Sequence, residues 1–177
     1  MVPTRGEGAG ERRLILLRHA KAEPSGGVAD ELRPLALAGR SQCGSIGAGL
    51  VAADLLPDHV LVSSAVRTRQ TWELVRSAMG GVPEPDVDVT DRVYEARTAD
   101  LVSLVREIDD RVRTLLVVGH EPTMSGVAAA LSGSGDDTAL AQVRTGLTTG
   151  SYALLEVASW SALAPRAARL LDVVRPG

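Results

Sequence analysis

The sequence predicts an α/β fold in which a mainly parallel sheet is covered by helices on both faces. Short, uninterrupted apolar runs alternate along the chain with segments of helical periodicity, and strands that are buried on both faces have this continuous apolar character. The length of 177 residues corresponds to one domain, and a chain of this size buries about 70 % of its surface on folding. We therefore expect a three-layer α/β/α sandwich over residues 13–177, preceded by a flexible tail over residues 1–12.

The first part of the chain contains two strand-helix units. Residues 14–17 are four consecutive apolar side chains and form the first expected strand. Apolar side chains recur every three or four positions over residues 43–53, which predicts a helix. Residues 59–62 predict a second strand, and residues 65–79 predict a helix that ends at two glycines. The first expected helix has four glycines in or near it: Gly39, Gly44, Gly47 and Gly49. Each costs about 1 kcal/mol in a helix interior, so either close packing compensates for them or the helix is broken.

The middle of the chain continues this alternation with a brief strand and a helix. Residues 87–89 suggest the strand. Apolar side chains over residues 101–108 repeat with the clearest helical period of the chain, and Thr98 is the expected cap of this helix.

The last part adds further strands around one helix. Residues 115–118 predict a fully buried strand, and a helix over residues 124–131 follows Pro122, a residue that favours the first turn of a helix. We expect a polar loop over residues 132–137. Two final strands are expected over residues 152–157 and 169–174. One strand of the otherwise parallel sheet is expected to run antiparallel, at an edge.

The composition argues against nucleic acid, membranes and metal ions as partners. The chain has 19 Lys and Arg against 22 Asp and Glu, a net charge of −3, and no segment that concentrates basic residues. No apolar run approaches the roughly 20 residues that span a bilayer. Cys43 is the single cysteine, which excludes an intramolecular disulfide and a multi-cysteine metal site. We expect a cytoplasmic protein that needs no cofactor or metal and is a monomer or a weak dimer.

Charged side chains follow three of the expected strands. Arg18 and His19 come directly after the first strand, Arg67 follows the second, and His120 follows residues 115–118. The carboxyl ends of parallel strands meet at one edge of a sheet, so these side chains should lie close together. Guanidinium and imidazole groups suit the negative oxygens of a phosphoryl group in transfer. A neutral imidazole can also attack phosphorus and form a covalent intermediate.

These segments resemble the three ordered motifs of the histidine phosphatase superfamily, in particular its short, SixA-like phosphohistidine phosphatase branch. The motifs are LLRHA at residues 16–20, SSAVRTRQT at residues 63–71 and VGHEP at residues 118–122. The segments DELRPL at residues 30–35 and YEA at residues 94–96 are also similar to that branch. The resemblance extends over about residues 13–175 and implies a phosphoglycerate mutase-like fold.

The resemblance implies roles for five residues. His19 would be the nucleophile, while Arg18, Arg67 and His120 would bind the phosphoryl group and stabilise its transition state. Glu95 matches the position that often supplies the proton donor. The nucleophile must be neutral and His120 is more useful as a cation, so we expect the two imidazoles to titrate apart and the rate to have a bell-shaped pH profile.

For other polar residues near the motifs, the sequence allows two interpretations each, one functional and one structural. Ser63 either caps the following helix or lines the phosphate site and binds substrate. Lys21 either contacts the substrate from its loop or is a solvated charge, and the same holds for Arg33. The Glu95 carboxylate could instead pair with a neighbouring arginine. His59 begins a strand without a partner motif and is expected to be structural.

The function expected from these features is hydrolysis of phosphohistidine in a protein, without a metal, through a covalent intermediate on His19. The expected partner of this protein is its phosphorylated substrate, in this case a histidine-phosphorylated protein. The short chain leaves little room for a lid over a small metabolite. One alternative is a broad-specificity phosphomonoesterase for small molecules, which an acid at Glu95 would favour. A second alternative is a phosphate-binding module without turnover.

Overall fold

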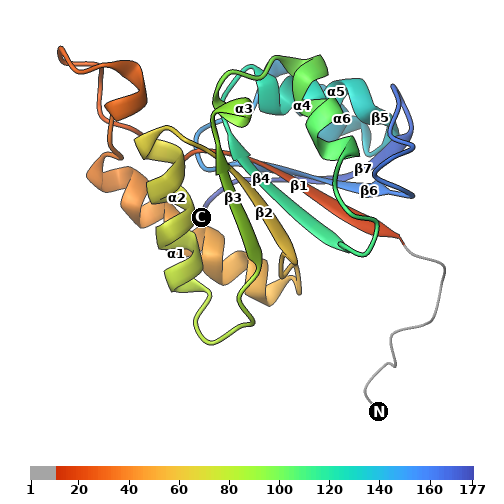
Figure 1. Ribbon diagram of the computed structural model, residues 1–177, viewed down its shortest axis with the longest axis horizontal. Coiled ribbons are helices and arrows are strands. Elements are labelled where there is room, and N and C mark those ends of the chain that lie inside the picture. The colour runs from red at the N-terminus through yellow and green to blue at the C-terminus, as the bar shows by residue number, and fades with distance from the viewer. Residues whose placement is uncertain (1–10) are drawn as a thin grey trace.

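The computed structural model describes residues 11–177, which form a seven-stranded sheet with helices on both faces (Figure 1). The strands are β1 (Arg12–Arg18), β2 (His59–Ser63), β3 (Asp86–Thr90), β4 (Thr114–Gly119), β5 (Ser132–Gly135), β6 (Tyr152–Val157) and β7 (Ala168–Val174). The helices are α1 (Leu37–Ala52), α2 (Val66–Ala78), α3 (Asp91–Tyr94), α4 (Thr98–Arg106), α5 (Thr123–Leu131) and α6 (Asp137–Thr145), with a 3-10 turn η1 (Asp30–Leu32) before α1. The predicted fold class is confirmed.

Two apolar clusters, one on each side of the sheet, form the core. Side chains alternate along a strand, so Ile15 and Leu17 of β1 pack with the helices α1 and α2. Leu14 and Leu16 point the other way and pack with α4, α5 and α6. Figure 1 shows the same division, with α1 and α2 on one side of the sheet and α3 to α6 on the other. All four apolar residues of β1 are fully buried, which explains their uninterrupted run in the sequence.

The strand order is β3-β2-β4-β1-β6-β7-β5. Strands β3, β2, β4 and β1 are parallel neighbours, which brings the carboxyl ends of these four strands to one edge. Strand β6 runs antiparallel to both β1 and β7. The reversed strand was expected at an edge, whereas β6 lies inside the sheet, and β7 and β5 extend the sheet beyond it.

Three local expectations differ from the structure. The expectation of a loop over residues 132–137 is wrong, because residues 132–135 pair with β7 as the edge strand β5. The helix α6 follows directly and was not expected. Thr98 is the first residue of α4 rather than its cap, and the backbone N–H of Arg97 donates to the side chain of Asp100 instead (3.0 Å).

Close packing explains two of the glycines in α1, which is unbroken. A Cβ atom on Gly47 would lie 2.5 Å from the backbone oxygen of Val75 in α2. A Cβ atom on Gly39 would lie 2.0 Å from the backbone oxygen of Lys21. Gly44 and Gly49 face open space, so only half of these glycines have a packing reason.

The described residues begin at the end of the expected tail. Residues 1–10 lie outside them, and Arg12 already belongs to β1. The start of the strand two residues before the apolar run follows from its pairing with β6, where Arg12 lies opposite Val157.

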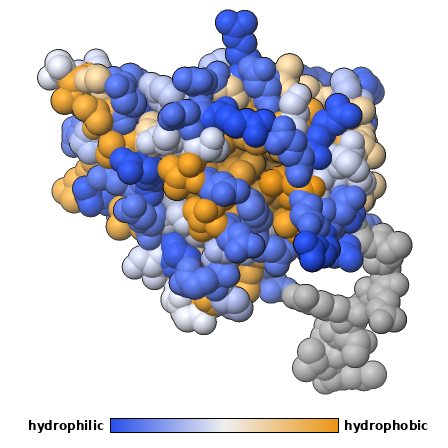
Figure 2. All heavy atoms as spheres, viewed as in Figure 1, coloured by the Kyte–Doolittle hydropathy of each residue, from blue (hydrophilic) through white to orange (hydrophobic). Residues whose placement is uncertain are grey.

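Figure 2 shows one face of the molecule, and most of its surface is hydrophilic. Apolar side chains gather at the centre of this face, where β2 and β3 lie in Figure 1. Edge strand β3 exposes Val87 and Val89. Within residues 11–177, no helix has the length and apolar character required to cross a membrane.

Candidate active site

A cavity of about 520 Å³ lies where β1, β2 and β4 end. Strand β1 ends in Arg18 and is followed by His19, β4 is followed by His120, and Arg67 lies in the first turn of α2, after β2. All four side chains line the cavity, and the ring centres of His19 and His120 are 5.4 Å apart. The structure therefore brings together the four residues that the strand-end motifs singled out. The other lining residues are Asp30, Arg33, Tyr94 and Glu121.

The His19 ring is held in one tautomer by the backbone. Its Nδ1 lies 2.7 Å from the carbonyl oxygen of Ala20. A carbonyl can only accept a hydrogen bond, so Nδ1 carries the proton and Nε2 keeps its lone pair. Burial is the main cause that lowers the pKa of His19 from 6.5 to about 4, and the charges of Arg67 and Arg18 add to it, against the hydrogen bond to Ala20. At neutral pH the ring is uncharged and Nε2 can act as a nucleophile.

His120 is hydrogen-bonded at both ring nitrogens. Nη2 of Arg67 lies 3.1 Å from Nδ1, and Oγ of Ser63 lies 2.7 Å from Nε2. A guanidinium can only donate, so Nδ1 is the acceptor and Nε2–H donates to Ser63. Burial lowers the pKa of His120 to about 3, and the charge of Arg67 acts in the same direction. We expected His120 to be a cation that titrates apart from His19, but in this structure both rings are neutral.

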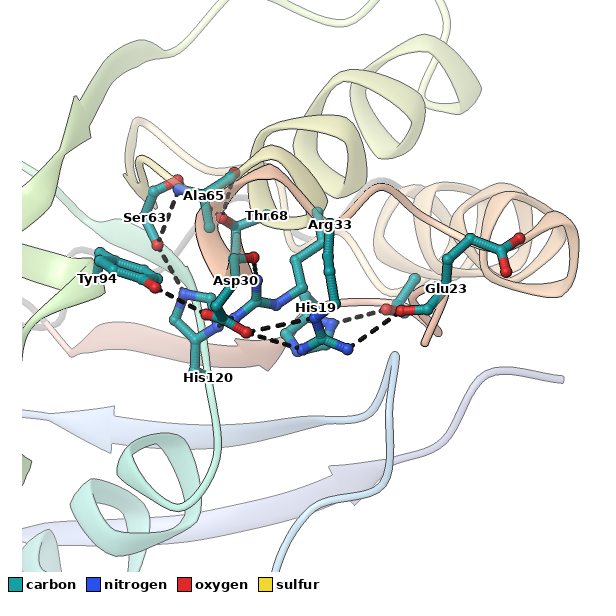
Figure 3. A network of polar contacts seen from close by, with 11 residues as sticks. His19, Glu23, Asp30, Arg33, Ser63, Ala65, Thr68, Tyr94 and His120 are labelled. Carbon is teal, nitrogen blue, oxygen red and sulfur yellow. Dashed lines mark hydrogen bonds and ion pairs between the residues drawn. The ribbon is translucent and has the colours of Figure 1, made fainter. Parts of the chain in front are cut away.

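Asp30 contributes a carboxylate to the cavity from the turn η1. Its Oδ2 accepts from Nη2 of Arg67 (3.0 Å) and from the Tyr94 hydroxyl (2.7 Å). Its backbone oxygen accepts from Nη1 of Arg67 (2.8 Å), and Oδ1 accepts from Nη2 of Arg33 (3.2 Å). The hydrogen bond from Tyr94, followed by that from Arg67, holds the pKa of Asp30 at about 2 against the effect of burial. Figure 3 shows this network around His19 and His120.

Arg18 is positioned through the loop before β6. Its Nη1 donates to the carbonyl oxygen of Leu147 (2.8 Å). The backbone N–H of Leu147 donates in turn to Oε2 of Glu121 (3.1 Å), and the N–H and hydroxyl of Ser125 donate to the same carboxylate (2.8 and 2.6 Å). Glu121 lines the cavity, but its carboxylate is engaged in holding this loop.

Three predicted residues do not line the cavity. Ser63 is fully buried behind His120 and contacts its ring. Lys21 is exposed, and its backbone N–H donates to Gln42 (2.9 Å). Glu95 is also exposed and lines a separate depression with Arg92 and other residues of that surface.

The position of Glu95 corrects the proton-donor expectation. The short helix α3 ends at Tyr94, and consecutive residues of a helical turn point about 100° apart, at 3.6 residues per turn. Tyr94 therefore lines the cavity while Glu95 does not.

The sequence analysis did not identify four lining residues as site residues: Asp30, Arg33, Tyr94 and Glu121. All four stand within or next to motif segments, and for Arg33 the sequence leaves open a substrate contact or a solvated charge. The missing information is how the loop that carries η1 folds back over α2, where Arg67 meets Asp30. The spacing of residues along the sequence does not predict this contact between Asp30 and Arg67.

Comparisons with known proteins place the chain in a family. The chain matches no protein-family model. It is 38 % identical over 158 residues to the uncharacterized protein Rv1276c of Mycobacterium tuberculosis, with 88 % of this chain and 96 % of that protein covered.

Solved structures of SixA proteins are similar over nearly the whole chain. A protein from Agrobacterium tumefaciens, assigned as the phosphohistidine phosphatase SixA, is 31 % identical with a TM-score of 0.77, covering 93 % of this chain and 98 % of that chain. A protein from Nakamurella multipartitia with the same assignment is 29 % identical with a TM-score of 0.82, covering 95 % and 98 %. With the motif residues gathered around one cavity, these likenesses show that the chain belongs to the histidine phosphatase superfamily, in its SixA-like branch, and is a phosphatase.

Proposed function

We propose that the protein hydrolyses phosphohistidine in a protein substrate and that His19 is the nucleophile. The observation that carries this proposal is the hydrogen bond between Nδ1 of His19 and the Ala20 carbonyl. It leaves the lone pair on Nε2 of a neutral ring in a cavity that Arg18 and Arg67 also line. Two guanidinium groups beside a nucleophile are suited to the charge of a phosphoryl group in transfer.

The reaction would run in two steps. Nε2 of His19 attacks phosphorus, and the bond between phosphorus and the substrate nitrogen breaks. Water then attacks the phosphorylated His19, the bond to Nε2 breaks, and inorganic phosphate is released with one water proton passed to solvent. Arg18 and Arg67 would neutralise the oxygens in both steps. For His120 to donate to a phosphoryl oxygen, Arg67 must release Nδ1 of the ring and that nitrogen must take up a proton.

The preference for phosphohistidine is supported by the carboxyl groups of the site. Asp30 has a pKa of about 2 and is ionised at neutral pH. The Glu121 carboxylate accepts three hydrogen bonds, and Glu95 lies elsewhere. None of these three acids is placed to protonate an alkoxide, which a phosphomonoester must release. An imidazole has an ordinary pKa of about 6.5 and can take its proton from solvent before it leaves.

A substrate panel tests the proposal. Purified protein should release phosphate from a phosphohistidine peptide faster than from a phosphoserine peptide, a sugar phosphate or p-nitrophenyl phosphate. Efficient hydrolysis of the sugar phosphate without release from the phosphohistidine peptide would instead favour a small-molecule phosphomonoesterase.

Substitution of the nucleophile tests the mechanism. His19→Ala should abolish turnover and the acid-labile phosphoenzyme that rapid quenching would trap, while some phosphate binding survives. His59→Ala is the matched control, because His59 pairs with Asp88 away from the cavity and should keep full activity. Unchanged hydrolysis in His19→Ala would rule out His19 as the nucleophile.

A further inference from the structure

The terminal nitrogens of Arg67 are already engaged by an acid of the protein itself. Nη1 donates to the backbone oxygen of Asp30 (2.8 Å) and Nη2 donates to its Oδ2 (3.0 Å). These are the two parallel donors with which an arginine binds a phosphate or carboxylate in fork geometry. The same carboxylate accepts from Arg33 and Tyr94. Asp30 thus engages three cavity groups that could donate to a phosphoryl oxygen.

The two partners differ in how firmly they are held. The Arg67 side chain is 6 % exposed, whereas the Asp30 side chain is 52 % exposed. Nε of Arg67 is buried and has no hydrogen-bond partner among the described residues. Asp30 belongs to a three-residue turn without buried residues. The carboxylate, not the guanidinium, is therefore the partner that can move.

We propose that Asp30 is an internal competitor for the phosphoryl site: its carboxylate must leave Nη2 of Arg67 before an oxyanion can bind there. This proposal rests on the proposed function only in taking the cavity to bind a phosphoryl group. It concerns affinity for the anion, which Asp30 weakens both by occupying the donors and by adding a negative charge to the cavity.

The competition has a consequence for turnover and selectivity. Free phosphate has only the cavity contacts with which to displace Asp30, so it binds weakly and the product leaves readily. A macromolecular substrate makes further contacts outside the cavity, and such remote binding energy can be used to displace the carboxylate. The internal acid would therefore reduce inhibition by cellular phosphate more than it reduces binding of a protein substrate.

A different role for Asp30 predicts the opposite change in phosphate affinity when the carboxylate is removed. If the carboxylate served to hold Arg67 in its binding orientation, its removal would weaken phosphate binding. If it competes, its removal tightens phosphate binding. A direct measurement of phosphate affinity separates the two roles.

The experiment is calorimetric titration of the whole protein with inorganic phosphate at pH 7 and low salt. Asp30→Asn should bind phosphate about tenfold more tightly than the unmodified protein, the size expected when a partly exposed charge-assisted contact no longer competes. Asp30→Ala, which removes both carboxylate oxygens and keeps the backbone oxygen that accepts from Nη1 of Arg67, should tighten binding as well. The difference from the unmodified protein should shrink as salt screens the exposed carboxylate.

Glu31→Gln is the matched control. Glu31 is the next residue of the same turn, is exposed, and does not line the cavity. It changes the net charge by the same amount and should leave phosphate affinity nearly unchanged. Unchanged or weaker binding in both Asp30 variants would overturn the proposal, and so would an equal tightening in Glu31→Gln. No substrate is turned over in this titration, so its result is independent of whether phosphohistidine is hydrolysed.

Discussion

Hydrogen bonds to the two site histidines decide which ring nitrogen carries the proton. The Ala20 carbonyl holds a proton on Nδ1 of His19. Arg67 and Ser63 together hold the proton of His120 on Nε2. Ser63 acts through His120 and is a positioning residue, since it does not line the cavity.

Removal of the Ser63 hydroxyl tests this positioning role. Ser63→Ala leaves the buried Nε2–H of His120 without its acceptor, and we expect kcat to fall about tenfold with little change in KM, an effect of one lost hydrogen bond. Nitrogen NMR of the imidazole should show a mixture of His120 tautomers in the variant. Ser64→Ala is the control, because the Ser64 hydroxyl donates to Asp91 and not to His120. An equal loss of kcat in both variants would contradict the assignment.

The helices α1 and α2 approach each other closely enough that a glycine is required at one point of contact. Beyond the Val75 oxygen, a Cβ atom on Gly47 would also lie 2.7 Å from the Cβ atom of Ala78. The same helix carries Gly44, which faces open space. Helix α2 presents Arg67 to the cavity from its first turn, whereas the contact with Gly47 lies in its last turn.

Two alanine substitutions in α1 should change stability with opposite signs. Gly47→Ala should lower the free energy of unfolding by about 1–3 kcal/mol, because backbone atoms of α2 must shift. Gly44→Ala should raise it by about 0.5–1 kcal/mol, because alanine has the higher helix propensity and nothing obstructs its methyl group. Urea denaturation measures both changes. A stabilised Gly47→Ala would show that the two helices can separate without cost.

At the scale of the whole molecule, burial of the site histidines links stability to pH. The pKa values of His19 and His120 lie near 4 and 3 in the folded protein, below the ordinary 6.5, and burial is the main cause for both. The unfolded chain therefore binds protons more readily than the folded protein between pH 6.5 and 4. The contribution is fully present above pH 6.5 and is lost as the pH falls toward 4.

The free energy of unfolding should accordingly fall by on the order of 2 kcal/mol per histidine when the pH is lowered from 7 to 5. Denaturation at a series of pH values measures the slope. His120→Gln should remove about half of it, whereas His59→Gln should leave it unchanged, since His59 lies outside the cavity. A slope in His120→Gln equal to that of the unmodified protein would mean that the His120 ring is not held neutral.

The sequence alone determined the alternation of elements and the residues at the strand ends. Buried strands must be apolar on both faces, so residues 14–17 and 115–118 were readable as β1 and β4 without any tertiary information. Parallel strands end at one edge, so the convergence of His19 and His120 followed from the same pattern. Short edge strands carry little such signal, which is why β5, with the sequence SGSG, was read as a loop.

Only the tertiary structure decided which acids and donors share the cavity. The turn at the end of α3 selects Tyr94 over Glu95, and the path of the loop before α1 brings Asp30 onto Arg67. The burial that lowers the pKa values of both histidines also arises from packing between distant segments. Local sequence patterns record which face of an element is apolar, but the approach of two loops depends on contacts across the whole fold.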